Sequence, residues 1–77
     1  MMKRAQFTET VRSFWKRQPF RPFVIEYEDG QRFIIEDPEA FGCYAGSANY
    51  FHPDGSLVIF ENEEVARIFD LSEINGN

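Results

Sequence analysis

The chain has 77 residues, of which 43% are hydrophobic and 27% are charged, and its net charge is −5 at pH 7. This length suits one domain, close to the lower limit at which a single core holds a chain folded. An aromatic share of 17% argues against disorder of the whole chain, because buried rings contribute strongly to a core. Cys43 is the only cysteine, which excludes an internal disulfide and a cysteine-rich zinc site. We expect one globular domain over 1–77 with loose ends at 1–6 and 72–77, and no cofactor or metal.

We expect neither a secretory signal nor a membrane span in this sequence. The basic start MMKRAQF is followed by the polar residues 8–10, whereas a signal peptide continues with an apolar segment of about 7 to 15 residues. A membrane span needs roughly 18 apolar residues in succession, and no stretch approaches that length. The sequence therefore predicts a cytoplasmic protein with no membrane partner.

The charges are divided unequally along the chain. Residues 1–22 carry six Lys and Arg residues against Glu9 alone, which gives +5, and residues 23–77 carry two Arg against twelve acids, which gives −10. Such asymmetry is typical of an anion-binding element on an acidic body. The alternative is that the basic segment docks on the acidic surface of its own domain or of a neighbour.

The first element expected in chain order is an amphipathic helix over about 8–18. Its apolar residues follow the i, i+4, i+7, i+8 spacing of one helical face, at Phe7, Val11, Phe14 and Trp15. Thr8 is a suitable N-cap, because a threonine hydroxyl accepts a hydrogen bond from the first turn. Gln18 should end the helix, since the ring of Pro19 disfavours helical geometry in the residue before it.

Basic side chains near this helix are the candidate contacts to a polyanion or to another partner. They are Arg12, Lys16, Arg17 and Arg21, and the first three lie away from the apolar stripe. The acidic residues in the rest of the chain oppose the binding of nucleic acid.

The segment 17–23 reads RQPFRPF and is interpreted as the joint between helix and sheet. Phe20 is expected to enter the core, and Pro22 favours an extended Arg21 that leads into a strand beginning at Phe23. The alternative is a proline-rich ligand, but such ligands are usually unpacked and extended.

From Phe23 the apolar period changes to two, which predicts a β-hairpin around Asp29-Gly30. A two-residue loop would set Glu26 beside Phe33, which mixes charged and apolar side chains on one face. A three-residue loop over 28–30 separates them. It pairs Phe23 with Ile35, Ile25 with Phe33, and Glu26 with Arg32.

Beyond the first hairpin we expect one helical turn, a second hairpin and a final strand. Asp37 is the expected N-cap of the turn, with Pro38 at its first position and Gly42 at its end. The second hairpin joins strands near 47–52 and 56–60 through the turn 53–55, and it pairs Phe51 with Leu57 and Tyr50 with Val58. Residues 65–70 favour a strand because Val, Ile and Phe do, although a short helix stays open.

The predicted fold class is therefore α+β. An N-terminal amphipathic helix packs on a bent antiparallel sheet of four to five strands, arranged as a small Sm-like or SH3-like barrel.

The order helix, QPFxPF, strand, DG turn, strand and PE resembles a family of short uncharacterised bacterial proteins. Here the pattern is Gln18 to Phe23, then Asp29-Gly30, then Pro38-Glu39. The resemblance covers roughly residues 8–40 and implies a recurring fold, and it transfers no catalytic residue.

The predicted helix followed by about five strands is also similar to the Sm-like fold of ring-forming RNA-binding proteins. The segment from Leu57 to Phe69, a strand, a four-residue step and a strand, carries this second resemblance. The step over 61–64 reads ENEE, where bacterial RNA chaperones of that fold carry a basic-histidine pair at the RNA pore. Binding of a phosphate chain depends on cations, so the architecture is expected to carry over without the pore function.

Residues able to perform catalysis are few. His52 is interpreted as an exposed turn residue and Cys43 as a structural thiol, since a reactive thiolate needs a cation or a base beside it. Glu61, Glu63 and Glu64 are interpreted as a solvated acidic turn, because a calcium loop needs more oxygen ligands and a glycine. No phosphate-binding glycine loop, HExxH or GxSxG motif is present.

The sequence predicts a non-enzymatic protein with no catalytic residue. Its aromatic residues exceed what a core of this size hides, and exposed apolar patches often mark interfaces. The expected function is a protein-interaction or self-associating module, whose partner is an unknown protein or a second copy. The alternatives are nucleic-acid or polyanion binding through the basic helix, and a small enzyme.

Overall fold

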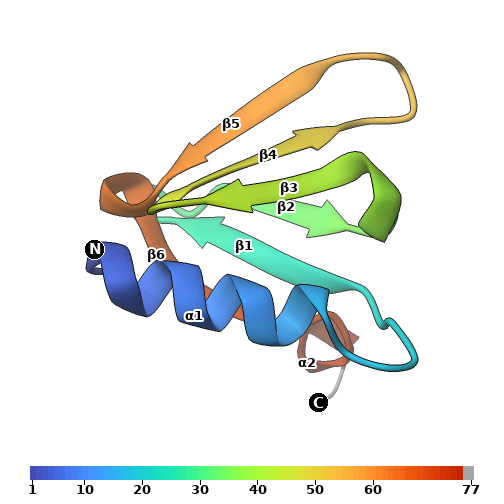
Figure 1. The fold of residues 1–77 in the computed structure, drawn as a ribbon, viewed down its shortest axis with the longest axis horizontal. Helices are drawn as coiled ribbons and strands as arrows, with labels where there is room; N and C mark the ends of the chain where they lie inside the picture. Colours follow the sequence, from blue (N-terminus) through green and yellow to red (C-terminus); the bar gives the residue numbers. More distant parts are fainter. Residues whose placement is uncertain (76–77) are drawn as a thin grey trace.

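The computed structural model describes residues 1–75 and has an α+β fold, which confirms the class expected from the sequence (Figure 1). The elements in chain order are α1 (Arg4–Trp15), β1 (Phe23–Tyr27), β2 (Arg32–Ile35), the 3-10 turn η1 (Pro38–Ala40), β3 (Phe41–Tyr44), β4 (Ser47–Phe51), β5 (Leu57–Glu61), the 3-10 turn η2 (Asn62–Glu64), β6 (Val65–Asp70) and α2 (Ser72–Asn75).

The strands form two antiparallel sheets of three, in the orders β2-β1-β6 and β3-β4-β5. One bent sheet of four or five strands was expected; the structure instead divides its strands between two sheets and has an additional strand, β3. Gly42 was expected to end the turn after Asp37, but it lies inside β3 opposite Asn49. A Cβ at Gly42 would lie 2.8 Å from Oδ1 of Asn49, so the asparagine side chain occupies the space beside the glycine. No ladder joins the two sheets within residues 1–75, so the barrel is not closed there.

Both predicted hairpins are confirmed in register. Phe23 pairs with Ile35, Ile25 with Phe33 and Glu26 with Arg32. The first loop closes through Gly30, whose φ of 94° is accessible to glycine and costly for other residues. In the second hairpin Phe51 pairs with Leu57 and Tyr50 with Val58. The final strand, expected over 65–70, is β6.

The first helix begins and ends earlier than expected. Its N-cap is Lys3 rather than Thr8, and Lys16 is its C-cap, so Arg17 and Gln18 lie beyond it. Thr8 instead uses its Oγ1 to accept a hydrogen bond of 2.8 Å from the backbone N–H of Gly46. The Thr8 hydroxyl therefore makes a tertiary contact and does not cap the helix.

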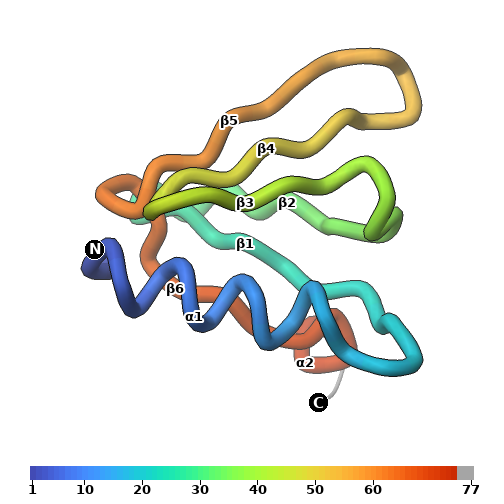
Figure 2. The backbone as a smooth tube through the Cα atoms, viewed as in Figure 1, coloured from blue at the N-terminus to red at the C-terminus, as the bar shows by residue number. Residues whose placement is uncertain are grey.

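The N-terminal residues are packed rather than loose, contrary to the expectation for 1–6. The Met2 side chain is 6% exposed, and its carbonyl accepts a hydrogen bond of 2.8 Å from Nδ2 of Asn62. Asn62 also donates its backbone N–H to the carbonyl of Gly46 at 3.0 Å. The N-terminus therefore lies beside the connection from β5 to β6 (Figure 2). Of the expected C-terminal loose end, 72–75 is the helix α2, and 76–77 lies outside the described residues.

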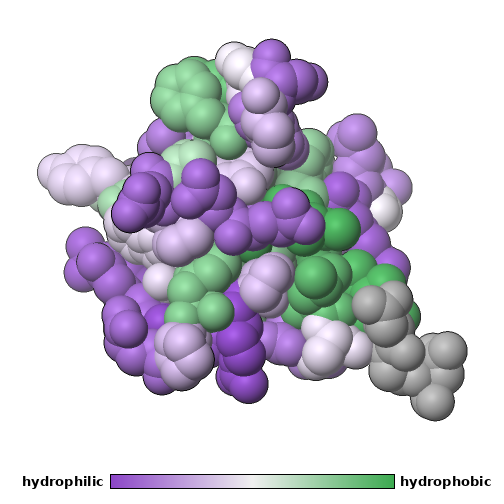
Figure 3. Space-filling model, turned by 90° about the vertical axis from the view of Figure 1, so that its right-hand side faces the viewer, coloured by the Kyte–Doolittle hydropathy of each residue, from purple (hydrophilic) through white to green (hydrophobic). Residues whose placement is uncertain are grey.

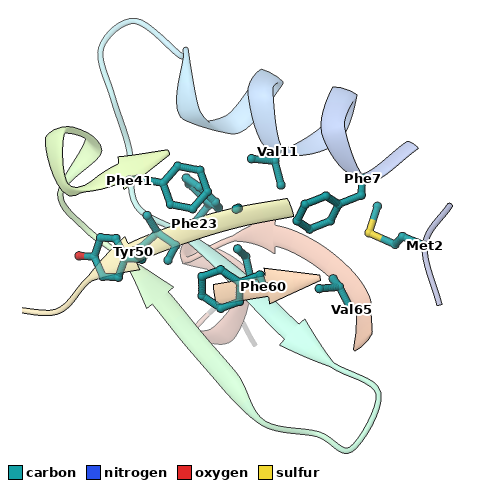
Figure 4. Packing of buried hydrophobic residues seen from close by; sticks show 11 residues of the cluster. Met2, Phe7, Val11, Phe23, Phe41, Tyr50, Phe60 and Val65 are labelled. Carbon is teal, nitrogen blue, oxygen red and sulfur yellow. The ribbon is translucent and has the colours of Figure 1, made fainter. Parts of the chain in front are cut away.

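The core lies between the inner faces of the two sheets and the apolar stripe of α1 (Figure 4). Phe7 and Val11 point from α1 toward Phe23 and Val65, and all four side chains are fully buried. Every strand contributes at least one side chain to this core or to its margin. Residues more than 40 positions apart are thus joined in one cluster, which a chain of this length needs for stability.

The RQPFRPF segment joins helix and sheet, as expected, but Phe20 enters the core only in part. Its ring is half-buried and meets the ring of Phe23 edge-on at a centroid distance of 6.2 Å. The carbonyl of Pro22 accepts the backbone N–H of Leu71 at 3.2 Å, which ties the start of β1 to the end of β6.

Candidate interaction surfaces

The outer face of sheet β3-β4-β5 carries large apolar side chains exposed to solvent. The register places four of them on the side opposite the core: Tyr44 (81% exposed), Phe51 (52%), Leu57 (49%) and Ile59 (54%). We call these four residues the apolar face. In Figure 3, green apolar side chains stand at the surface over the β4–β5 hairpin at the top of the molecule, among purple polar ones.

The outer face of the other sheet is covered in large part, although Ile34, which pairs with Val24, is 40% exposed there. Val24 and Phe69 lie opposite each other there, and they are 0% and 7% exposed. The guanidinium groups of Arg32 and Arg67 lie 5.7 and 4.2 Å from the Phe69 ring, and α2 contacts β6. Glu26 forms ion pairs with both arginines. The hydrogen bond from Arg67, and after it the one from Arg32, lowers the pKa of the Glu26 carboxyl. The chain thus covers Val24 and Phe69 on one outer sheet face and leaves four large apolar side chains exposed on the other.

Strand β5 is an edge strand without the usual protection. It pairs only with β4, and its residues LVIFE include no proline and no lysine. Natural edge strands commonly use proline, lysine, bulges or a covering segment to prevent pairing with other chains. Among the described residues, the one hydrogen bond to the β5 backbone from outside the sheet is that of the Tyr27 hydroxyl to the Ile59 carbonyl, at 3.5 Å.

The sequence contains a signal for this exposed apolar face in residues 57–60. Residues 57–60 are apolar at every position, although a strand with one solvated face alternates apolar and polar residues. Since the core covers only Val58 and Phe60, the side chains of Leu57 and Ile59 must face away from it.

The four basic residues predicted to contact a partner lie along α1 and the segment after it. Arg12, Lys16 and Arg21 are exposed, and no ion pair among the described residues involves them. The ammonium group of Lys16 lies 4.5 Å above the Trp15 ring, which leaves its charge at the surface.

Arg17, the fourth, is a structural residue. Its guanidinium forms an ion pair of 2.6 Å with Asp70 and donates to the carbonyl of Arg21 at 2.9 Å. Hydrogen bonds from Ser72 and then from Arg17 lower the pKa of Asp70 to about 2. The expectation that the basic segment docks on its own acidic surface thus holds for this one residue.

The two candidate reactive side chains are not assembled into a site. Burial raises the pKa of the Cys43 thiol, against the weaker effect of Arg12, and no hydrogen bond among the described residues reaches this thiol. A raised pKa disfavours the nucleophilic thiolate. The ring of His52 packs edge-on against Tyr50 at 5.2 Å.

An acidic hollow of about 400 Å³ lies at the β1–β2 loop and η2. Its lining includes Glu28, Asp29, Glu63 and Glu64. Glu28 forms an ion pair with the N-terminal amino group. Within residues 1–75 no group of three His, Cys, Asp or Glu side chains is arranged to hold a metal ion.

Comparisons of this chain with family models, with curated proteins and with solved structures find no match. In the part of the chain that the structure describes, no helix combines the length and the apolar character required to cross a membrane. The surfaces themselves are therefore the basis for a functional proposal.

Proposed function

We propose that this protein is a non-catalytic protein-interaction module that associates with itself through the apolar face and the free edge of β5. The observation that carries the proposal is the contrast between the two sheets. Arginine side chains lie over Phe69 on the outer face of one sheet, where Val24 and Phe69 are buried, while four large apolar side chains stay exposed on the other.

The physical reason is the free energy of apolar burial. Burying apolar surface contributes roughly 25 cal/mol per Å², and contiguous exposed apolar patches on small proteins often mark interfaces. A second copy is the most economical occupant, because the edge of β5 offers unpaired backbone groups next to the apolar face, so one contact can satisfy both. Closed symmetric assemblies of one chain are the commonest oligomers.

The two resemblances seen in the sequence are also part of this proposal. An N-terminal helix, two three-stranded sheets and a 3-10 turn between the last two strands support the likeness to the Sm-like fold, whose members form rings. We also propose membership of the short bacterial family with the QPFxPF pattern, and a cytoplasmic location.

Sedimentation velocity tests self-association, with total protein varied from about 1 to 500 µM. The expected result is a sedimentation coefficient that rises with concentration. Ile59→Lys should raise the dissociation constant at least tenfold, because it places a charge in the middle of the apolar face.

Ile34→Lys is the matched control, since Ile34 is also an exposed isoleucine on a strand but lies on the other sheet. Its association should equal that of the natural chain. A monomer at every concentration, or an equal effect of both lysine variants, would overturn the proposed self-association.

A further inference from the structure

The chain carries a second surface, which the proposed self-association does not use. We define the basic surface as the exposed cations of residues 1–22 that have no ion pair among the described residues: Lys3, Arg4, Arg12, Lys16 and Arg21. Only Arg17 of this segment is neutralised by the domain itself. Five positive charges are therefore presented to solvent along α1 and the segment that follows it.

The positions of these cations form an extended surface. Arg12 and the C-cap Lys16 are four residues apart, about 6 Å along the axis, and Arg4 lies eight residues before Arg12, about 12 Å away. Beyond the helix, Arg21 lines a hollow of about 410 Å³ together with Arg17, Gln18 and Pro19. A linear anion could thus contact several cations at once.

The acids of the chain are concentrated elsewhere. Glu26 is held by two arginines of its own sheet. Glu28, Asp29 and two glutamates of η2 line the acidic hollow at the β1–β2 loop. On the helix itself, Glu9 is the one acid. The protein is therefore strongly polarised, and its net charge of −5 understates the local positive potential at α1.

The composition of this surface favours a phosphate chain over a protein as the occupant. The large exposed apolar side chains of the described residues are Met1, Ile34 and the four residues of the apolar face, so none belongs to the segment 3–22. Protein interfaces need a core rich in apolar and aromatic residues and are depleted in lysine. Binding to phosphates needs only cations that replace counterions.

We propose that the basic surface binds the phosphate backbone of nucleic acid without reading its bases. The inference goes beyond the proposed self-association and does not depend on it. With up to five contacts to a single strand, log K should fall with log salt with a slope of at most about −3.5.

The test is fluorescence anisotropy of a labelled 20-nucleotide dT strand, titrated with the natural protein at about 50 to 300 mM salt. The variant is Arg12→Gln/Lys16→Gln, which changes two exposed side chains of the helix. Loss of two phosphate contacts should reduce the magnitude of the slope by about 1.4 and weaken binding at least tenfold at about 50 mM salt.

The control is Gln31→Glu/Ala66→Glu, which lowers the net charge by the same two units at exposed positions outside the basic surface. Circular dichroism establishes that both double variants are folded. The control should bind within about threefold of the natural chain. No binding at about 50 mM salt, equal weakening by both variants, or binding only to vesicles of anionic lipid would overturn the proposal. Sedimentation of the same variants keeps this outcome separate from self-association.

Discussion

Replacement of Gly46 by alanine should destabilise the domain more than any other change at its positive-φ glycines. Gly46 has a φ of 85°, and a Cβ there would lie 2.6 Å from Cγ of Arg4 and 3.2 Å from Oδ1 of Asn62. A residue other than glycine in the left-handed region costs about 1–2 kcal/mol. The contact with Arg4 must be relieved by rotation of its side chain or by movement of the first turn of α1, and such movement endangers the hydrogen bond from the Gly46 N–H to Thr8.

The expected magnitude follows from these two contributions. Loss of a partly buried hydrogen bond costs about 1–3 kcal/mol, so Gly46→Ala should lower the free energy of unfolding by about 2–5 kcal/mol. Gly55 is the matched control, because its φ is 93° and a Cβ there would meet no atom within 4 Å. Gly55→Ala should therefore cost only the backbone contribution, about 1–2 kcal/mol.

Urea unfolding followed by circular dichroism measures both variants. A chain of 77 residues has a stability of about 4–12 kcal/mol at the usual value per residue, so both transitions should be observable. The difference between the two variants reports the contact between α1 and the β3–β4 turn. If both lose the same free energy, the close packing at this junction contributes nothing and the reasoning is wrong.

Three further predictions concern side chains at the ends of α1 and β6 and in the segment after α1. The folded pKa of Asp70 is about 2, below its ordinary 3.8. The stabilising contribution of this carboxylate is therefore present above about pH 4 and is lost as the pH falls toward 2. Asp70→Asn should flatten the acid unfolding curve in that window, and an unchanged curve would contradict this. Trp15→Phe removes the hydrogen bond of 2.9 Å from Nε1 to the carbonyl of Pro38 and should cost about 1–2 kcal/mol in urea unfolding; a neutral effect would mean that this bond does not hold α1 against η1. Phe20→Ala should cost about 1–2 kcal/mol, less than the roughly 3–5 kcal/mol of a fully buried ring, and a loss above 3 kcal/mol would show that the ring is core.

The parts of the fold that were predictable are those with local signals. Strand register follows from separating Glu26 from Phe33, because one residue of slip moves a side chain to the other face. The segment 41–46 contains no such signal, since Gly42 interrupts the pattern of β3 and Gly46 follows the strand in the turn. Gly42 pairs with Asn49 in the next strand, and Gly46 packs against Arg4 in the first turn of α1, which is distant in sequence.

The candidate surfaces were predictable only in kind. Charge asymmetry identified the basic segment, but the separation of Arg17 from its neighbours depends on Asp70, which is 53 positions later in the chain. The aromatic excess indicated an exposed patch without placing it. The cover of the other sheet includes Arg67, which lies over the Phe69 ring near the other end of the chain.

The two proposed surfaces lie on different elements, so self-association leaves the basic surface free and should strengthen the binding of a long strand. The apolar face belongs to β3, β4 and β5, and the basic surface belongs to α1 and the segment after it. Self-association would then repeat the basic surface, and a strand already bound to one copy meets the next at a high effective concentration. A dT strand long enough to span several copies should therefore bind the natural chain more tightly than Ile59→Lys does. A strand that reaches only one copy should bind both alike. Equal affinities for the long strand would show that association leaves the basic surfaces too far apart, or wrongly oriented, to act together.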